Sequence, residues 1–201
     1  MHNELADFNL NSSLSCDVCV IGSGPAGLAV VSKLLDSDYE TIILESGSVD
    51  PLSEHQLLNK GESVGPREIN LTGSRLRCFG GAGKIWAGVC RPMSDLDFNK
   101  RNFIPYSGWP ISFNDLSRFY KEAASILEIS YDEFFDDSWK SLFKVSLSFK
   151  EFQRKGSLLK GLLFQQASPE KKDLSNKYKQ AIYRSTNVRL ITDATVTDMD
   201  S

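Results

Sequence analysis

The chain has 201 residues, 41% of them hydrophobic, and a formal net charge of −3. This length supports one well-buried core, or one core with a smaller appendage. The near balance of acidic and basic residues excludes a strongly charged surface for nucleic acid, and no apolar run reaches the roughly 18 residues of a transmembrane helix.

The amino-terminal part predicts a flexible leader followed by a strand, a glycine turn, a helix and a second strand. Residues 1–14 are polar and show no basic region followed by an apolar stretch, so they predict a leader and no secretory signal. Residues 16–21, CDVCVI, form a mostly apolar run, which predicts a strand packed on both faces. Residues 28–35 have helical spacing and residues 41–45 predict another strand. This order predicts a βαβ unit.

The remainder of the chain predicts two further helices among loops and strands. Residues 46–74 are rich in Gly, Ser, Pro and Asn and predict a long loop. A capping-box pattern and one apolar face predict a helix over 113–128. Alternation over 144–150 predicts a strand. A Ser-Pro start predicts a helix over 168–184, and residues 187–201 predict one strand or a short hairpin.

The four cysteines give no clear metal site. Cys16 and Cys19 have the spacing of a redox pair or of half a zinc site. A regular strand would place them on opposite faces, so ordinary buried cysteines are favoured and no metal is predicted. Nothing in the cysteine pattern requires an oxidising compartment, and a cytoplasmic protein is the default expectation.

The turn between the first predicted strand and helix has the spacing of a dinucleotide-binding turn. Gly22 permits a tight turn, Gly24 lets the backbone approach a diphosphate, and Gly27 allows close packing of helix on strand. Glu45 ends the next strand, where an acid can bond ribose hydroxyls. An acid there disfavours NADP but does not separate FAD from NAD. The alternative is a glycine turn of another α/β protein, with Glu45 solvated.

A second glycine-rich block, GSRLRCFGGAGKIWAGVCRP, follows the long loop. Glycine at this density lets a backbone lie against a flat or charged ligand, and Arg75 and Arg77 are candidates to face phosphate oxygens. The alternative is an irregular loop that needs positive φ angles. Composition alone supports both equally.

The motifs VIGSGPAGLAV, LESG, RLRCFGGAGKIWAG and SGWPIS, in this order, resemble the glucose-methanol-choline family of FAD-dependent oxidoreductases. The resemblance covers about Cys16 to Leu127. It implies an α/β fold: a Rossmann-type FAD-binding βαβ domain with an incomplete α+β substrate domain. The implied domains are 15–130 for FAD binding, 131–185 for the start of a substrate or cap region, and 186–201 for a strand returning to the sheet.

The resemblance also assigns cofactor-binding residues. The diphosphate would lie on the first turn, the ribose on the acid, the remaining cofactor along the second block and the adenine on a late valine. These residues are Gly22, Ser23, Gly24, Pro25, Ala26, Gly27, Glu45, Arg77, Gly80, Gly81, Ala82, Gly83, Trp86 and Val196. The family usually has Ser or Thr where this chain has Ala82. The block has no histidine for covalent attachment, so non-covalent FAD is expected.

The resemblance implies oxidation of CH–OH groups of an alcohol or sugar, with hydride transfer to flavin N5. The family's catalytic histidine lies near the carboxyl terminus of a longer chain, and neither His2 nor His55 matches it. His55 is expected to be exposed. We therefore expect no catalytic residue here, a truncated chain and little activity from it alone. A non-catalytic nucleotide-binding module and an NAD-dependent enzyme remain alternatives.

Overall fold

A computed structural model describes residues 1–9, 12–135 and 162–200, which fold as two compact units. The first unit combines Met1–Trp86 with Lys172–Ser201, and the second is Ala87–Lys171. These limits differ from the expected boundaries at 130 and 185, because the last helix and strand rejoin the amino-terminal sheet. The expected strand at 144–150 lies outside the described residues.

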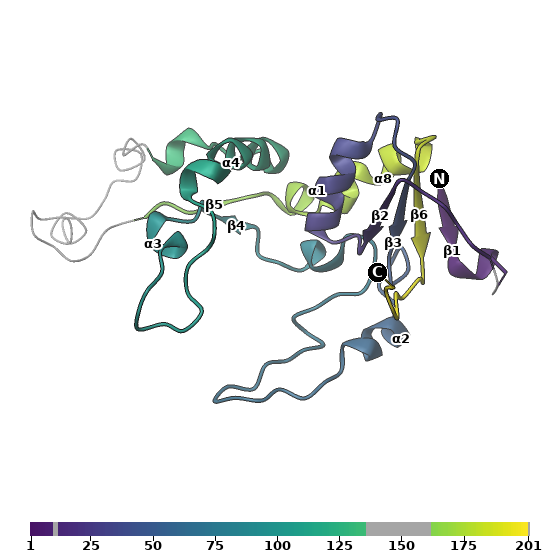
Figure 1. Ribbon diagram of the computed structural model, residues 1–201, viewed down its shortest axis with the longest axis horizontal. Helices are drawn as coiled ribbons and strands as arrows, with labels where there is room; N and C mark the ends of the chain where they lie inside the picture. Colours follow the sequence, from purple (N-terminus) through teal and green to yellow (C-terminus); the bar gives the residue numbers. More distant parts are fainter. Residues whose placement is uncertain (10–11, 136–161, 201) are drawn as a thin grey trace, which may run out of the picture. The chain divides into compact units, whose positions relative to one another are not determined.

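The first unit is built around a parallel sheet with strand order β1-β6-β3-β2 (Figure 1). Its elements in chain order are β1 (His2–Glu4), η1 (Leu5–Asp7), β2 (Val18–Ile21), α1 (Pro25–Leu34), β3 (Thr41–Leu44), α2 (Ser53–Gln56), η2 (Leu57–Asn59), η3 (Gly81–Lys84), α8 (Leu174–Arg184) and β6 (Val188–Thr192). The register places Thr41 beside both Val18 and Val188. The predicted strand–helix–strand unit is confirmed, and the fold is compatible with a Rossmann-like arrangement.

The first residues of the chain form an edge strand where a flexible leader was expected. β1 pairs in parallel with β6, and His2 lies opposite Leu190. The Met1 ammonium donates hydrogen bonds to the carbonyls of Ile182, at 2.8 Å, and Val188, at 3.0 Å. A polar sequence suits this position because an edge strand needs backbone pairing on one side only.

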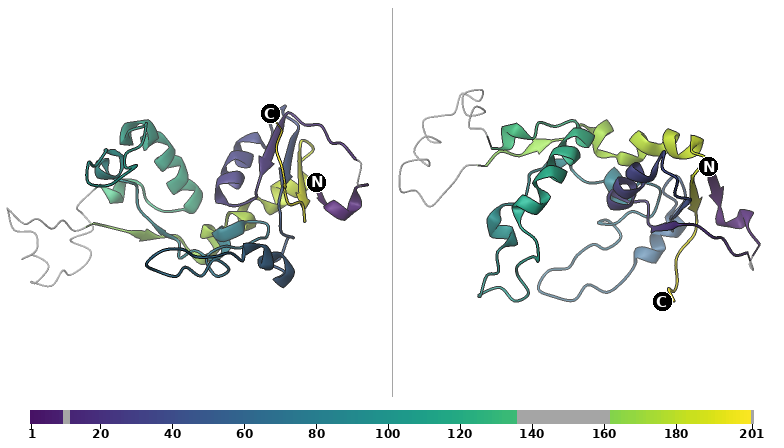
Figure 2. Two further views of the ribbon diagram at one scale, coloured as in Figure 1. Left: turned by 60° about the horizontal axis from the view of Figure 1, so that its bottom comes forward. Right: turned by 45° about the horizontal axis from the view of Figure 1, so that its top comes forward.

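The two faces of the sheet are covered differently. One face packs against α1 and α8, which contact each other, as Figure 2 shows from two further sides. On that face Ile43 and Leu190 are fully buried, and so is Val31 of α1. On the other face an apolar cluster includes Ile42 and Ile191, with Phe8, Cys16 and Leu44 packed against it.

β2 lies at the end of the strand order, where the second face is only partly covered. Ile21 is 52% exposed and Cys19 is exposed. The predictions that residues 16–21 pack on both faces and that Cys19 is buried are therefore wrong. An apolar run specifies a strand, but it does not specify that the strand is central in its sheet.

The second unit holds an antiparallel strand pair and one long helix. Its elements are β4 (Val89–Cys90), α3 (Asp95–Phe98), α4 (Phe113–Leu127), η4 (Asp132–Phe134), β5 (Gln165–Gln166) and α7 (Pro169–Lys172), with β4 paired to β5. α4 confirms the predicted helix. Its capping box is formed because the Asp115 carboxylate accepts hydrogen bonds from the N–H and hydroxyl of Ser112.

Of the two predictions near the carboxyl end, the helix needs adjustment and the single strand is confirmed. The helix expected over 168–184 is split into α7 and α8, because Asp173 interrupts it and caps the second part. The final stretch forms β6, and the described residues that follow it contain no second strand. Among the described residues, no helix is long and apolar enough to span a membrane.

Candidate functional site

The turn between β2 and α1 begins with a left-handed glycine and ends at a helix N-cap. Gly22 has φ +90° and donates its N–H to the Leu44 carbonyl at 2.8 Å. Gly24 is the N-cap of α1, and Pro25 takes the first helical position, where its missing N–H costs no hydrogen bond. The N–H groups of Ala26 and Gly27 have no intrahelical acceptor at this end of the helix. The turn therefore presents the positive end of the α1 dipole.

The second and third glycines of the turn differ in what the packing requires. A Cβ atom on Gly27 would lie 2.0 Å from the carbonyl oxygen of Gly22 and 3.3 Å from Val20 Cγ1. A Cβ atom on Gly24 would meet no heavy atom within 4 Å. Folding thus requires glycine at 27 but not at 24. The open space beside Gly24 is what a closely approaching phosphate would need.

Glu45 is buried against this turn. Its Oε2 accepts hydrogen bonds from the Ser23 N–H at 2.9 Å and the Ser23 hydroxyl at 2.5 Å, and its Oε1 accepts one from the Gly47 N–H at 2.9 Å. Only 6% of Glu45 is exposed, which contradicts the alternative of a solvated strand end. A carboxylate has about four acceptor positions, so roughly one remains for a ligand hydroxyl.

The second glycine block lies directly against the first turn. The Gly80 N–H donates to the carbonyl and the hydroxyl of Ser23, 57 residues away, both at 3.2 Å. A Cβ atom on Gly81 would lie 3.1 Å from the Cα of Gly24. Because no side chain separates them, the two backbones approach each other closely.

The same block is held on its other side by the start of α8. Gly80 has φ +97°, and a Cβ atom there would lie 2.7 Å from Ser175 Cβ. Asp173 is the N-cap of α8: its carboxylate accepts from the N–H of Ser175 at 2.9 Å and lies 3.8 Å from Lys84 Nζ. Sequence analysis missed Asp173 and Ser175. A capping pattern can identify Asp173 as a cap, but no local signal brings it to Gly80.

The remaining residues of the two glycine regions lie along an accessible edge. Pro25, Ala26 and Ala82 are exposed, whereas Gly83 is buried. A Cβ atom on Gly83 would lie 3.1 Å from Pro25 Cγ. The expected site residues of both regions are therefore brought together at the start of α1.

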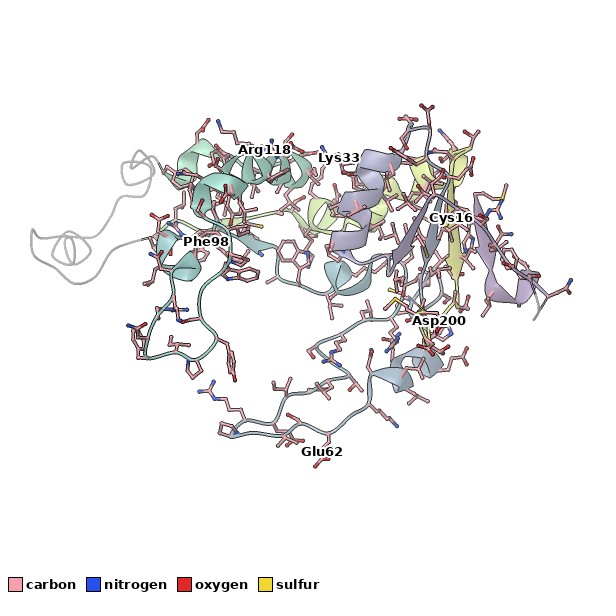
Figure 3. All side chains as sticks on the ribbon, viewed as in Figure 1. Cys16, Lys33, Glu62, Phe98, Arg118 and Asp200 are labelled. Carbon is pink, nitrogen blue, oxygen red and sulfur yellow. The ribbon has the colours of Figure 1, made fainter. Side chains whose placement is uncertain are left out.

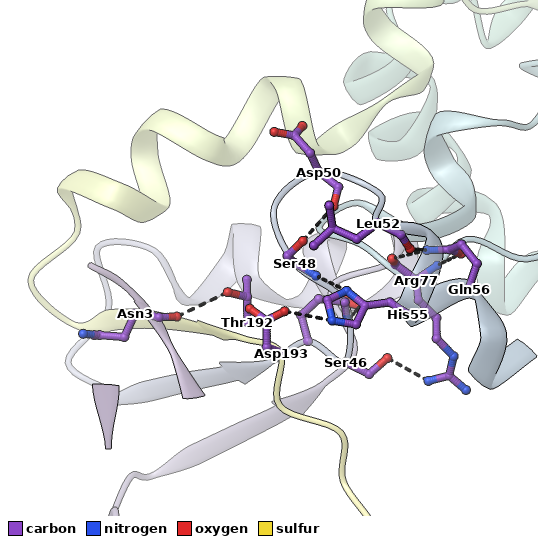
Figure 4. Close-up of polar contacts among 12 residues, drawn as sticks. Asn3, Ser46, Ser48, Asp50, Leu52, His55, Gln56, Arg77, Thr192 and Asp193 are labelled. Carbon is purple, nitrogen blue, oxygen red and sulfur yellow. Dashed lines mark hydrogen bonds and ion pairs between the residues drawn. The ribbon is translucent and has the colours of Figure 1, made fainter. Parts of the chain in front are cut away.

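Arg77 takes a different place from its neighbours in the sequence. Its Nε donates to Asn59 Oδ1 at 2.8 Å. Its Nη1 donates to Ser46 Oγ at 2.7 Å (Figure 4). Its main chain exchanges hydrogen bonds with the Gln56 side chain, N–H to Oε1 at 2.9 Å and Nε2 to C=O at 2.8 Å. The guanidinium thus fixes the loop after β3, and most of its donors are engaged there.

His55 joins the same loop to the end of β6. It was expected to be exposed, but it is largely buried. Its Nε2 lies 3.1 Å from Asp193 Oδ1, and its Nδ1 accepts the Ser48 N–H at 3.3 Å (Figure 4). Its side chain is 18% exposed. The accepting role of Nδ1 assigns the ring proton to Nε2. This histidine ties two chain segments together beside Glu45.

Two more expected residues flank the turn at a greater distance along the chain. Trp86 is half-buried, and its Nε1–H donates to the Lys172 carbonyl at 3.0 Å, while Lys172 Nζ donates to the Trp86 carbonyl. Val196 is half-buried and lies two residues beyond Ala194, whose N–H donates to the Glu45 carbonyl at 2.9 Å. Trp86 is therefore anchored to Lys172, and Val196 follows a segment that is bonded to Glu45.

The fold and the turn define a parallel α/β protein with a glycine-rich strand-to-helix bend and a buried acid beside it. No family model matches the chain. In an alignment 135 positions long that covers 57% of the chain, it is 29% identical to 2-methyl-1,2-propanediol dehydrogenase of Mycolicibacterium austroafricanum. Over 48 residues, 23% of the chain, it is 38% identical to gamma-glutamylputrescine oxidoreductase of Escherichia coli K12. The matches span 24% and 11% of these two relatives.

Proposed function

We propose that this chain binds FAD non-covalently and is the cofactor-binding portion of an oxidoreductase that acts on CH–OH groups of an alcohol or sugar. The observation that carries the proposal is the convergence of both glycine regions and Glu45 at the start of α1. The names of the two similar proteins support a general oxidoreductase role, and one of them is a diol dehydrogenase. The motif resemblance to the glucose-methanol-choline family adds the flavin and the substrate class.

Different parts of the cofactor would be bound by different described residues. The first-turn N–H groups of α1 would hold the diphosphate, with Gly24 leaving space for it. Glu45 would accept a hydrogen bond from one ribose hydroxyl through its remaining acceptor position. The backbone of Val196 would contact the adenine, and Gly80–Trp86 would run toward the flavin. Bound FAD supplies a hydride acceptor for alcohol oxidation.

We assign no catalytic base to this chain. His55 is engaged with Asp193 and with the N–H of Ser48. His2 Nε2 lies 3.1 Å from Thr192 Oγ1, and its ring stacks on Tyr183. Both imidazoles thus have structural contacts. This supports a cofactor-binding role, without proton transfer by His2 or His55, for the residues that the structure describes.

The test is an FAD titration of the purified chain and of Gly24→Ala, followed by flavin fluorescence. The φ of −65° at Gly24 and the open space around it allow an alanine without loss of folding. A methyl group there would keep the diphosphate from the backbone, so we expect affinity to fall about tenfold or more, equivalent to about 1.4 kcal/mol. Circular dichroism of both proteins provides the folding control.

Three results would contradict the proposal in different ways. Equal FAD affinity of the two folded proteins would show that the diphosphate does not bind at the first turn. Binding of NAD in preference to FAD would favour an NAD-dependent enzyme. Binding of ADP-ribose as tightly as FAD would favour a module that recognises only the nucleotide half.

A further inference from the structure

Cys16 and Cys19 lie on the same face of the sheet, contrary to the expectation for a regular strand. The N–H groups of Asp17 and Val18 both donate to the Glu40 carbonyl, at 2.9 and 3.1 Å, and the chain bends at Asp17. Two consecutive N–H groups on one carbonyl are the mark of a β-bulge, which inserts one extra residue and shifts the alternation of side chains by one. The bulge therefore places the side chains of Cys16 and Cys19 on the same face of the sheet.

The packing around the two cysteines agrees with this geometry. Cys19 is paired in register with Ile42, so the two side chains share a face. Cys16 packs against the cluster that contains Ile42, and Figure 3 shows it beside the sheet of the first unit. The two side chains thus lie on the same face of the sheet.

The backbone at the bulge also suits a short covalent link. The bend at Asp17 lies between the two cysteines, where a tight turn would bring their Cα atoms together. Turns of this kind bring the flanking Cα atoms to within about 7 Å, and disulfides span Cα distances of about 4.4–6.8 Å. Closure of a bond between Cys16 and Cys19 therefore requires little rearrangement.

We propose that Cys16 and Cys19 are a dithiol site that closes to an intramolecular disulfide by exchange with a small disulfide of the glutathione class. The Cys19 thiolate attacks one sulfur of that disulfide and expels a thiolate, which leaves a mixed disulfide on Cys19. The Cys16 thiolate then attacks Cys19 Sγ and expels the second small thiol. One small disulfide is reduced to two thiols, and two cysteine thiols lose their protons and two electrons to become one disulfide.

The order of the two steps follows from exposure. Cys19 is exposed and meets the oxidant first, whereas Cys16 is half-buried and is placed to resolve the mixed disulfide. Burial, and then the neighbouring Cys16, raise the pKa of Cys19 above its ordinary value. Because the thiolate is the attacking form, exchange becomes faster as pH rises, about tenfold per pH unit below the thiol pKa.

The other two cysteines provide internal controls. Cys78 is buried, and burial raises its pKa to about 11. Cys90 is half-buried in the second unit, and its Sγ donates to the Gly88 carbonyl at 3.3 Å. Neither has the exposure of Cys19, so both should stay reduced while the pair at the bulge reacts.

The experiment treats the reduced, purified chain with oxidised glutathione and measures intact mass and alkylatable thiols over time. The wild type should lose two hydrogen atoms and two alkylatable thiols, and peptide mapping should find Cys16 linked to Cys19. Cys16→Ser should stop at a stoichiometric glutathione adduct on Cys19. Cys19→Ser should remain unmodified. Circular dichroism before treatment shows that both serine variants are folded.

Two outcomes would overturn the proposal. A stable glutathione adduct on Cys19 of the wild type would show that Cys16 cannot resolve it. Modification of Cys78 or Cys90 at the rate of Cys19 would show that the thiols react because the chain unfolds. The folded chain would then have no specific dithiol site. Neither outcome depends on FAD, so failure here is separate from failure of the cofactor proposal.

Discussion

The first glycine turn and the second glycine block lie in contact, but different constraints explain their glycines. In the first turn, Gly27 is required by the backbone of the same βα unit, where Gly22 lies five residues away. In the second block, Gly80 is confined by Ser23 on one side and Ser175 on the other. In the local motif, glycine is required by contacts a few residues away, whereas in the second block it is required by residues far away in the sequence.

The largest effect is expected for Gly27→Ala, which tests the local constraint. The new methyl group would overlap the Gly22 carbonyl, and backbone cannot move aside as a flexible side chain would. We expect a loss of roughly 3 kcal/mol or more in the free energy of unfolding, measured by urea denaturation. Gly24→Ala is the matched control and should stay near wild type. Similar stability of the two variants would refute the distinction.

A smaller effect is expected for Gly80→Ala, which tests the long-range constraint. Alanine must adopt φ +97° and place its Cβ 2.7 Å from Ser175 Cβ, so we expect about 2 kcal/mol of destabilisation. Ser175→Gly removes the opposing atoms but not the strained φ.

A double-mutant cycle separates the two causes at Gly80. The pair Gly80→Ala and Ser175→Gly should show a favourable coupling of about 0.5 kcal/mol or more in urea denaturation. Strict additivity would mean that backbone strain accounts for the whole effect and that α8 does not confine the block.

The smallest effect is expected at Asp173, which caps α8 beside the block. Asp173→Ala removes the acceptor for the Ser175 N–H and should cost about 1 kcal/mol in thermal or urea unfolding. Asp173→Asn keeps an N-cap acceptor and should cost less. If asparagine were as damaging as alanine, the Lys84 ion pair at 3.8 Å would matter more than the cap.

Local patterns were sufficient to predict several elements of this chain. The order of β2, α1 and β3, the helix α4 and the strand β6 all follow from short-range periodicity and capping. The glycine turn and Glu45 were predicted as neighbours, since a parallel βαβ unit places the end of its second strand beside the first turn.

The tertiary structure decided the features that depend on residues far apart in the sequence. Cys16 and Cys19 were expected on opposite faces, but they share a face because the chain bends at Asp17, before β2 begins. The guanidinium of Arg77 bonds Ser46 and Asn59, which lie 31 and 18 residues away and which no local pattern connects to it. The polar amino terminus gained order only because β6 offers it an edge.

The glycine turn and the acid that faces it were predictable from local sequence, because both belong to one short βαβ unit with fixed spacing. Long-range packing brings Gly80 to Ser23, Asp173 and Ser175 to Gly80, and Cys16 to the face that holds Cys19. The physical reason is the range of the interactions. Backbone sterics and periodicity act over a few residues, whereas packing and hydrogen bonds select partners that lie anywhere in the chain.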